Sequence, residues 1–296
     1  MTDRSEGLPL EPLWSGEEGP IPETDTRGGE LPAPLAARYK GNLTIDLRPD
    51  RPTIVANFVS SLDGVVALGK SEPNAGGGEI SGFSAADRYM MALLRGLADV
   101  VVVGAGTLRV GRRHVWTAAH LQPALAGVFA NWRSELGLTP QPTTIVVTAS
   151  GNLDATHSGL NEPDVPVIVV TTKAGAELLA ALPFSPNVRI EAVGDGADVP
   201  AEALLEVIRG TGARLALCEG GPHLFGEILG ARLIDELFLT LAPQVIGRDA
   251  TSVHRLSFVE GTSFSGGHGR WATLSSIRRA GDDLFLRYRF EPSPRA

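Results

Sequence analysis

The sequence predicts an α/β fold in which a mostly parallel sheet carries helices on both faces and ends in a C-terminal antiparallel hairpin. Three observations predict it. From residue 53 onwards, short apolar segments alternate with helical ones. Several apolar segments, such as DVVVV at 99–103, lack the alternation of a half-exposed strand and therefore predict strands buried on both sides. The last two segments, 271–278 and 284–290, do alternate, which is typical of antiparallel strands. The expected architecture is three-layered, αβα.

The individual elements follow from the same patterns. The first are a strand at 53–59 and a helix at 84–97, for which Ser84 is the expected N-cap with Asp87 three residues later. Further strands are expected at 144–148, 167–171, 188–193, 214–218 and 236–242, and further helices at 175–181, 201–208 and 222–229. The closing hairpin turns at Ala280, Gly281 and Asp282.

Residues 1–50 differ from the rest of the chain. Prolines and glycines are interleaved with acidic residues there, and no apolar periodicity is visible. Such a segment buries too little surface to offset its chain entropy, so we expect a flexible N-terminal arm followed by one domain over 51–296. An arm that wraps around a partner subunit is the alternative.

Composition excludes several classes of protein. The 296 residues carry a net charge of −8, which argues against a nucleic-acid backbone as the main partner. No apolar run is long enough for a membrane span, and no secretory signal begins the chain. A single cysteine, Cys218, permits no internal disulfide and indicates a reducing compartment, so a cytoplasmic protein is expected. The histidine spacing suits no zinc site, so no metal is expected.

Two glycine-containing loops follow predicted buried strands. The first is Gly104-Ala105-Gly106-Thr107, where a Rossmann fingerprint would require glycine at position 109, which is Arg109. The second is Glu219-Gly220-Gly221 before Pro222, where a glycine pair opens a helix and exposes unpaired N–H groups at the positive end of its dipole. The second loop favours an anion site over a packing turn, whereas a tight turn explains the first equally well.

Five further residues have two interpretations each. Thr148 and Ser150 follow another buried strand and either line a ribose or cap a turn. Asp63, in Ser60-Ser61-Leu62-Asp63-Gly64, either forms a turn or assists proton transfer. Arg95 and Arg88 lie on one side of a helix, where a solvated salt bridge is commoner than a phosphate contact.

Taken together, four stretches resemble the reductase domain of riboflavin biosynthesis, the C-terminal half of the bifunctional deaminase-reductase. They are RPTIVANFVSSLDG (51–64), AADRYMMALLRGLADVVVVGAGTLR (85–109), CEGGPHLFGEIL (218–229) and LIDELFLTLAPQVIG (233–247). Their order and spacing match over roughly 51–290, and the stand-alone actinobacterial pyrimidine reductase branch is the most similar.

The resemblance implies a dihydrofolate-reductase-like fold, NADPH as hydride donor, a homodimer, and reduction of the ribosyl carbon of 5-amino-6-(5-phosphoribosylamino)uracil. It implies Asp63 as the catalytic position, with a proton from Asp63 or ordered water, and Ser61, Arg95 and Glu219 as substrate contacts. The implied cofactor positions, taken with the loops above, are Val59, Gly104, Ala105, Gly106, Thr107, Thr148, Ser150, Gly220, Gly221, Pro222, His223, Leu224 and Phe225.

The sequence departs from the family pattern in two places. It lacks the His-x-Glu and Pro-Cys-x-x-Cys motifs of the deaminase half. The stretch after Thr107, which normally holds the substrate phosphate, is Val110 to Trp116 with arginines at 112 and 113. Those arginines, with Arg109, are also candidates for the 2′-phosphate of NADPH. The alternatives are therefore a reductase of dihydrofolate or another pteridine, and an NADP(H)-binding module without turnover.

Overall fold

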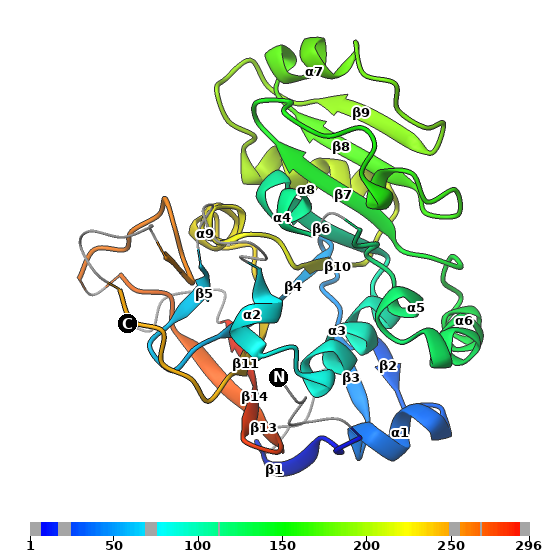
Figure 1. Cartoon of the computed structure of the whole chain (residues 1–296), viewed down its shortest axis with the longest axis vertical. Coiled ribbons are helices and arrows are strands. Elements are labelled where there is room, and N and C mark those ends of the chain that lie inside the picture. The colour runs from blue at the N-terminus through cyan, green and yellow to red at the C-terminus, as the bar shows by residue number, and fades with distance from the viewer. Residues whose placement is uncertain are drawn as a thin grey trace.

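The computed structural model describes residues 7–16, 25–68, 76–111, 113–248, 255–266 and 268–290. A ten-stranded sheet forms its centre (Figure 1). Seven strands run parallel, in the order β11 (Glu236–Leu241), β4 (Thr53–Ser60), β10 (Leu215–Cys218), β6 (Val100–Gly104), β7 (Thr143–Thr148), β8 (Val167–Thr171) and β9 (Val188–Ala192). Beyond β11, the sheet continues antiparallel through β14 (Asp283–Phe290), β13 (Ala272–Ala280) and β1 (Glu11–Ser15). The predicted parallel sheet and C-terminal hairpin are confirmed.

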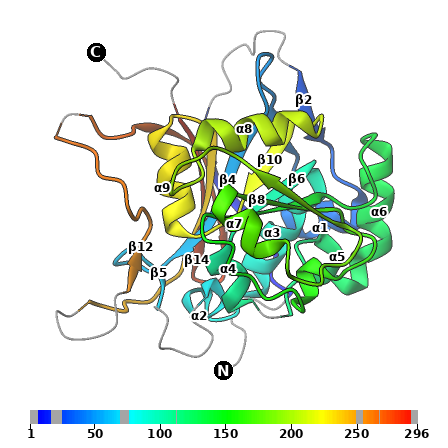
Figure 2. The ribbon, with the colours of Figure 1, turned by 90° about the horizontal axis from the view of Figure 1, so that it is seen from above.

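Helices cover both faces of the sheet (Figure 2). On one face lie α1 (Ala33–Tyr39), α3 (Ala85–Leu97), α5 (Ala118–Leu121), α6 (Ala126–Glu135) and α7 (Lys173–Leu179). On the other lie α8 (Ala201–Gly210) and α9 (Pro222–Gly230). Successive residues of β6 alternate between the two cores, with Val101 and Val103 in the first and Val100 and Val102 in the second. A strand covered on both faces needs apolar residues at every position, which explains the DVVVV run.

Helix α3 forms where the sequence predicts it. The Ser84 hydroxyl accepts a hydrogen bond from the backbone N–H of Asp87 at 3.2 Å, which satisfies one of the donors left free in the first turn. Eleven of its thirteen residues are buried, because α3 lies between the sheet and α5 and α6. The capping signal and the apolar face therefore fix the position of this helix above the centre of the sheet.

The N-terminal segment differs from the predicted flexible arm. Strand β1 pairs with β13, and β2 (Thr26–Gly29) pairs with β3 (Leu43–Asp46). Helix α1 connects β2 to β3 in the chain. Leu10, Leu35 and Leu43 are completely buried in the first core. The prediction of a flexible arm is wrong for the described residues of this segment, because their prolines precede or begin elements, as Pro32 does at the N-cap of α1, while widely spaced apolar residues still reach the core. Residues 1–6 and 17–24 lie outside the described part.

All seven parallel strands end at one edge of the sheet, which we call the carboxyl edge. It carries Ser60, Gly104, Thr148, Cys218 and Leu241, the last residues of β4, β6, β7, β10 and β11. Short elements surround it: α2 (Gly77–Ser81), α4 (Ala105–Val110), β5 (Val65–Ala67), β12 (Leu256–Ser257) and the 3-10 turns Pro123–Leu125 and Ser158–Leu160. In doubly covered sheets, ligands bind at this edge.

Three consecutive glycines, 76–78, stand at the start of a short helix. Gly77 and Gly78 begin helix α2, and a Cβ atom at Gly77 would lie 3.1 Å from a methyl group of Val59. Ile80 of the same helix packs with Val59 and Val65 in a small third core. The glycine therefore permits α2 to lie close to the end of β4.

Candidate functional site

The two glycine-containing loops of the carboxyl edge lie against each other. A Cβ atom at Gly220 would come within 2.6 Å of both the Gly104 nitrogen and the Val103 Cα. Because such an approach is closer than any side chain tolerates, Gly220 is required by the packing of β10 against β6. For this one glycine, the packing explanation left open by the sequence is sufficient.

Gly221 and Gly106 have a different explanation. Gly221 has φ +64°, and a Cβ atom there would lie 3.5 Å from the Thr107 hydroxyl, while one at Gly106 would meet nothing within 4 Å. Helix α9 begins at Pro222, so the N–H groups of its first turn have no partner within the helix. The open space beside two glycines, a hydroxyl and a helix N-terminus fits a pyrophosphate.

The residues after Gly221 divide between this opening and the core. His223 is exposed and Leu224 is half-buried at the first turn of α9. The Phe225 side chain, in contrast, is completely buried against Phe58 and Phe258. The Phe225 ring therefore faces the core, so that a cofactor contact by this residue is left to its backbone and stays a prediction.

The loop after β7 follows a strand that packs against α4, the helix that also contacts β6. The side chain of Thr148 is buried, whereas Ser150 is exposed and its hydroxyl accepts a weak hydrogen bond from the Asn152 N–H at 3.4 Å. Arg109, at the end of α4, donates to the Asn152 carbonyl at 3.3 Å. Ser150 and Arg109 therefore both contact the backbone of Asn152, in the loop where the adenosine ribose is expected. Arg113 is exposed, and Arg112 lies outside the described residues.

Asp63 is an ionised loop anchor. Its carboxylate accepts hydrogen bonds from the Ser61 hydroxyl at 2.7 Å and from the backbone N–H groups of Ile246 at 3.1 Å and Gly247 at 2.7 Å. These bonds, the one from Ser61 first, lower the pKa of Asp63 to about 2. A carboxyl group with that pKa holds no proton at neutral pH, so the expectation that Asp63 donates a proton is not supported. Ser61 is buried and also accepts from the Val65 N–H.

Arg95 is buried and fully engaged by the protein. Its Nε and Nη2 atoms donate to the two carboxylate oxygens of Glu219 at 2.9 and 2.6 Å, and Nη2 contacts His114 Nε2 at 2.8 Å. Its Nη1 atom donates to the carbonyls of Val115 and Thr117. Burial, and then the nearby Arg95 charge, lower the pKa of His114 to about 2, so this imidazole is neutral. In this structure the Arg95 guanidinium therefore fixes residues 114–117, and its expected contact with the substrate stays a prediction.

Val59 and Arg88 also have internal partners. The Val59 side chain is covered by α2 in the third core, so it does not face an opening. The Arg88 guanidinium donates to the Phe83 carbonyl at the surface. The ligand-facing part of the carboxyl edge is therefore carried by Gly106, Thr107 and Gly221 and by the first turn of α9.

One buried acid of this region has no signal in the sequence. The sequence marks Asp87 only as a helix-capping residue, yet its carboxyl group is buried and hydrogen-bonded to the Thr240 hydroxyl. Burial, the largest cause, raises the pKa of Asp87 to about 6. The motif DELFLTLAPQ contains Thr240, but no spacing in the sequence connects it with residue 87.

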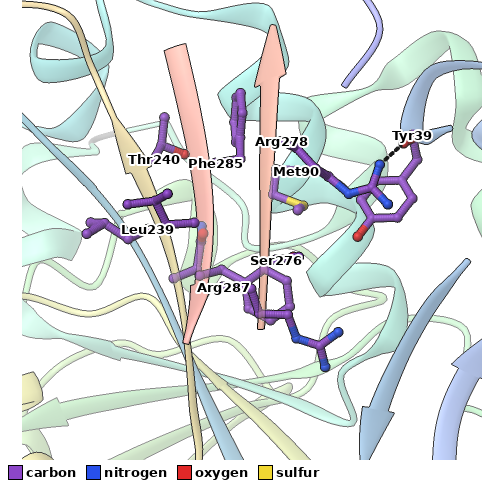
Figure 3. Close-up of a pocket in the computed structure, with 11 residues that line it drawn as sticks. Tyr39, Met90, Leu239, Thr240, Ser276, Arg278, Phe285 and Arg287 are labelled. Atoms are coloured by element: carbon purple, nitrogen blue, oxygen red, sulfur yellow. Dashed lines mark hydrogen bonds between the residues drawn. The ribbon is translucent and has the colours of Figure 1, made fainter. Parts of the chain in front are cut away.

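A small cavity of about 10 Å³ lies beside Thr240, between α3 and the strands β11, β13 and β14 (Figure 3). Met90, Phe285 and Arg278 are among the residues that line it. A volume of this size holds at most one water molecule, so the cavity is not the substrate site.

Comparison with known proteins gives relatives of one kind. A protein named 2,5-diamino-6-ribosylamino-4(3H)-pyrimidinone 5′-phosphate reductase from Methanothermobacter thermautotrophicus is 28% identical over 69% of this chain and 83% of its own. One of the same name from Archaeoglobus fulgidus is 27% identical over 81% of this chain and 99% of its own. Both names agree with the predicted oxidoreductase class.

The solved structures agree on the fold. A pyrimidine reductase-like protein from Corynebacterium diphtheriae superposes with a TM-score of 0.62 at 21% identity, over 81% of this chain and 92% of that one. The predicted α/β architecture with a mostly parallel central sheet is confirmed. The model of the RibD C-terminal domain matches residues 52–284, which is most of the chain. The chain therefore belongs to the RibD C-terminal domain family, as its four motifs predicted.

Proposed function

We propose that this protein is an NADPH-dependent reductase that transfers a hydride to the ribosyl carbon of a phosphoribosylamino-pyrimidine in riboflavin biosynthesis. The observation that carries the proposal is the opening between Gly106, Thr107 and Gly221 at the N-terminus of α9. It is open where a pyrophosphate needs room, and it lies at the edge where parallel sheets bind nucleotides.

The residues of this opening fit a nicotinamide dinucleotide. The N–H groups at the start of α9 and the Thr107 hydroxyl would hold its pyrophosphate, and Ser150 would lie on its ribose side. Arg109, exposed beside Ser150, is the described basic residue best placed for a 2′-phosphate. When bound, the cofactor supplies the hydride, while the protein supplies orientation and charge.

The pyrimidine is the less defined part of the proposal. Both curated relatives carry the name of a 2,5-diamino-pyrimidinone phosphate reductase. The sequence motifs point instead to 5-amino-6-(5-phosphoribosylamino)uracil, which has a carbonyl where the other compound has an amino group. Because Arg95 is held by Glu219, the substrate phosphate needs another partner, and Arg113 is exposed near the same loop.

A cofactor titration followed by an oxidation assay tests the proposal. We expect the purified protein to bind NADPH more tightly than NADH, measured by fluorescence, and to oxidise NADPH with one of the two pyrimidines. Oxidation only with dihydrofolate would replace the substrate by a pteridine. Binding without oxidation of any substrate would indicate a module without turnover, and absence of binding would refute the cofactor site.

Two features stay predictions from the family resemblance: a homodimer and a cytoplasmic location. Within the described residues, no helix is long and apolar enough to cross a membrane. Light scattering of the purified protein with and without NADPH will give the oligomeric state.

A further inference from the structure

Every N–H donor of the Arg95 guanidinium is in use. Its Nε and Nη2 atoms donate to the two carboxylate oxygens of Glu219, and Nη1 donates to the carbonyls of Val115 and Thr117. The second hydrogen of Nη2 is left for His114, whose Nε2 atom lies 2.8 Å away. Because a guanidinium donates and does not accept, the imidazole has to accept at Nε2, so this nitrogen carries no proton.

The contact with Arg95 therefore sets the tautomer of His114. A neutral imidazole without a proton on Nε2 carries its proton on Nδ1, on the other side of the ring. Within the described residues, Nδ1 has no hydrogen-bond partner, and the half-buried side chain leaves this atom accessible. The ring thus presents one free N–H donor.

The surroundings keep this imidazole neutral. Burial, the largest cause, and then the positive charge of Arg95 lower the pKa of His114 to about 2. The other titratable groups that face the ring are His120, on α5, and His157, at the N-cap of a 3-10 turn. Neither is acidic, and the Glu219 carboxylate is bonded to Arg95 through both oxygens. His114 therefore donates without carrying a charge.

The orientation of the ring is fixed by the residues around it. The His114 backbone N–H donates to the Gly111 carbonyl at 2.7 Å, and the ring packs edge-on against Trp116 with the centroids 5.1 Å apart. Trp116 is buried and stacks on His157, whose Nε2 atom lies 2.9 Å from the same Gly111 carbonyl. A donor held on several sides is preorganised, which lowers the entropic cost of a contact with a ligand.

This donor lies at the carboxyl edge. His114 follows α4, the helix that carries Thr107, and it packs against His120 of α5, which lies beside α3 (Figure 1). Through Nη2 of Arg95 it is joined to Glu219, which directly precedes the glycine pair of the proposed cofactor opening. The free N–H group therefore belongs to the edge at which the substrate of a parallel-sheet enzyme has to lie.

The charge at this point selects the kind of ligand atom. The charges of Arg95 and Glu219 cancel in their ion pair, and His114 adds none. Phosphate groups are held by charged donors or by helix N-termini, and His114 offers neither. A neutral N–H group suits a neutral oxygen, such as that of a hydroxyl or a ring carbonyl.

We propose that His114 is a substrate-binding residue, which donates a hydrogen bond from Nδ1 to a neutral oxygen of the pyrimidine substrate. This inference rests on the proposed function and adds to it the group that recognises the uncharged part of the substrate. The substrate phosphate then has its partner elsewhere, and Arg113, exposed and next to His114 in the chain, is available for it.

The first test needs neither cofactor nor substrate. Nitrogen-15 NMR of the histidine-labelled protein should show one imidazole, absent in His114→Gln, that keeps its proton on Nδ1 between about pH 5 and 8. An ordinary histidine titrates within that range. A His114 signal that titrates there, or that carries its proton on Nε2, would overturn the inference.

Two substitutions separate the contact with the substrate from the contact with Arg95. In His114→Gln, the amide oxygen takes the place of Nε2 and accepts from Arg95, whereas nothing replaces the Nδ1 donor. We expect this variant to unfold at the urea concentration of the wild type. Its KM for the pyrimidine should rise about three- to tenfold with kcat changed less than about twofold, as for loss of one neutral hydrogen bond. In His114→Asn, the shorter amide keeps the donor and loses the acceptor, so stability should fall while KM stays near the wild-type value.

The matched control is His268→Gln, at an exposed histidine before β13, which should change neither stability nor KM. A KM of His114→Gln equal to that of the wild type would overturn the inference. So would a loss of stability in His114→Gln as large as in His114→Asn, because the residue would then act only as a partner of Arg95.

Three compounds identify the oxygen. With 5-amino-6-(5-phosphoribosylamino)uracil and with its dephosphorylated form, the KM of His114→Gln should exceed that of the wild type by the same factor. A factor near one with the second compound would assign the donor to the phosphate and overturn the inference. 5,6-Diaminouracil, which has the ring alone, serves as an inhibitor. Weaker inhibition of the variant than of the wild type would place the contact on the ring, and equal inhibition would place it on the ribosyl chain.

The outcomes separate this inference from the proposed function. A wild type that turns over the pyrimidine, with a titrating His114 or an unaffected His114→Gln variant, would refute the substrate contact alone. A wild type that oxidises no reduced nicotinamide with either pyrimidine would refute the proposed function, and the substrate contact with it.

Discussion

The carboxyl edge has a buried floor, formed by Asp87, Arg95, Glu219 and Thr240, and an open rim, formed by Asp63, Gly106, Thr107 and Gly221. Each carries an aspartate, and the pKa values of the two are shifted in opposite directions. Asp63 at the rim accepts three hydrogen bonds and has a pKa of about 2, whereas Asp87 in the floor is raised to about 6 by burial. The same residue type is held ionised by its donors in one region and titrates at a higher pH in the other. Its environment, and not its identity, decides its chemistry.

The floor is where a single substitution should destabilise the protein most. Glu219→Gln removes the whole negative charge of the partner and leaves the Arg95 guanidinium charged and buried, and we expect a loss of about 3–5 kcal/mol in the free energy of unfolding. Urea denaturation measures it. Glu227→Gln, an exposed position on α9, is the matched control and should change stability little. A small loss for Glu219→Gln would show that the floor tolerates an unpaired charge.

At the rim, the largest effect should be on binding. We expect Gly221→Asp to weaken NADPH binding by about 100-fold, since a carboxylate would face the pyrophosphate at a helix N-terminus, a loss of about 2.7 kcal/mol. The positive φ of Gly221 strains any side chain, so Gly221→Asn is the control, with the same shape and no charge. Equal affinities in the two variants would attribute the loss to backbone strain and remove the anion site.

The smallest effect belongs to Asp63. Its pKa is depressed, so its hydrogen bonds stabilise the fold above the unfolded value of 3.8 and are lost as pH falls towards 2. We expect the stability difference between the wild type and Asp63→Asn to be constant from pH 5 to 7 and to shrink between pH 4 and 2. Thermal unfolding at several pH values measures it. A difference that persists at pH 2 would mean that Asp63 does not anchor the 246–247 loop as a carboxylate.

Most of the fold could be predicted from local patterns, because its strands are continuous apolar runs and α3 has both a cap and an apolar face. The rim could be predicted as well, since Gly221 and Pro222 mark a helix N-terminus in the sequence. The floor could not. Asp87 at the third helical position is ordinary capping chemistry, and only the packing of α3 on β11 makes it a buried acid. The N-terminal segment was missed for a related reason, since its leucines find their core only in tertiary contacts.

The docking of that segment has a practical consequence. Strand β1 covers the outer side of β13 at the end of the ten-stranded sheet. A chain shortened to begin at residue 51 would leave β13 as an unpaired edge and uncover the apolar surface under α1 and β3. Open edges of that kind recruit other chains. The described residues of this segment thus cover an edge strand and apolar surface, and we expect a shortened protein to associate even if its carboxyl edge is intact.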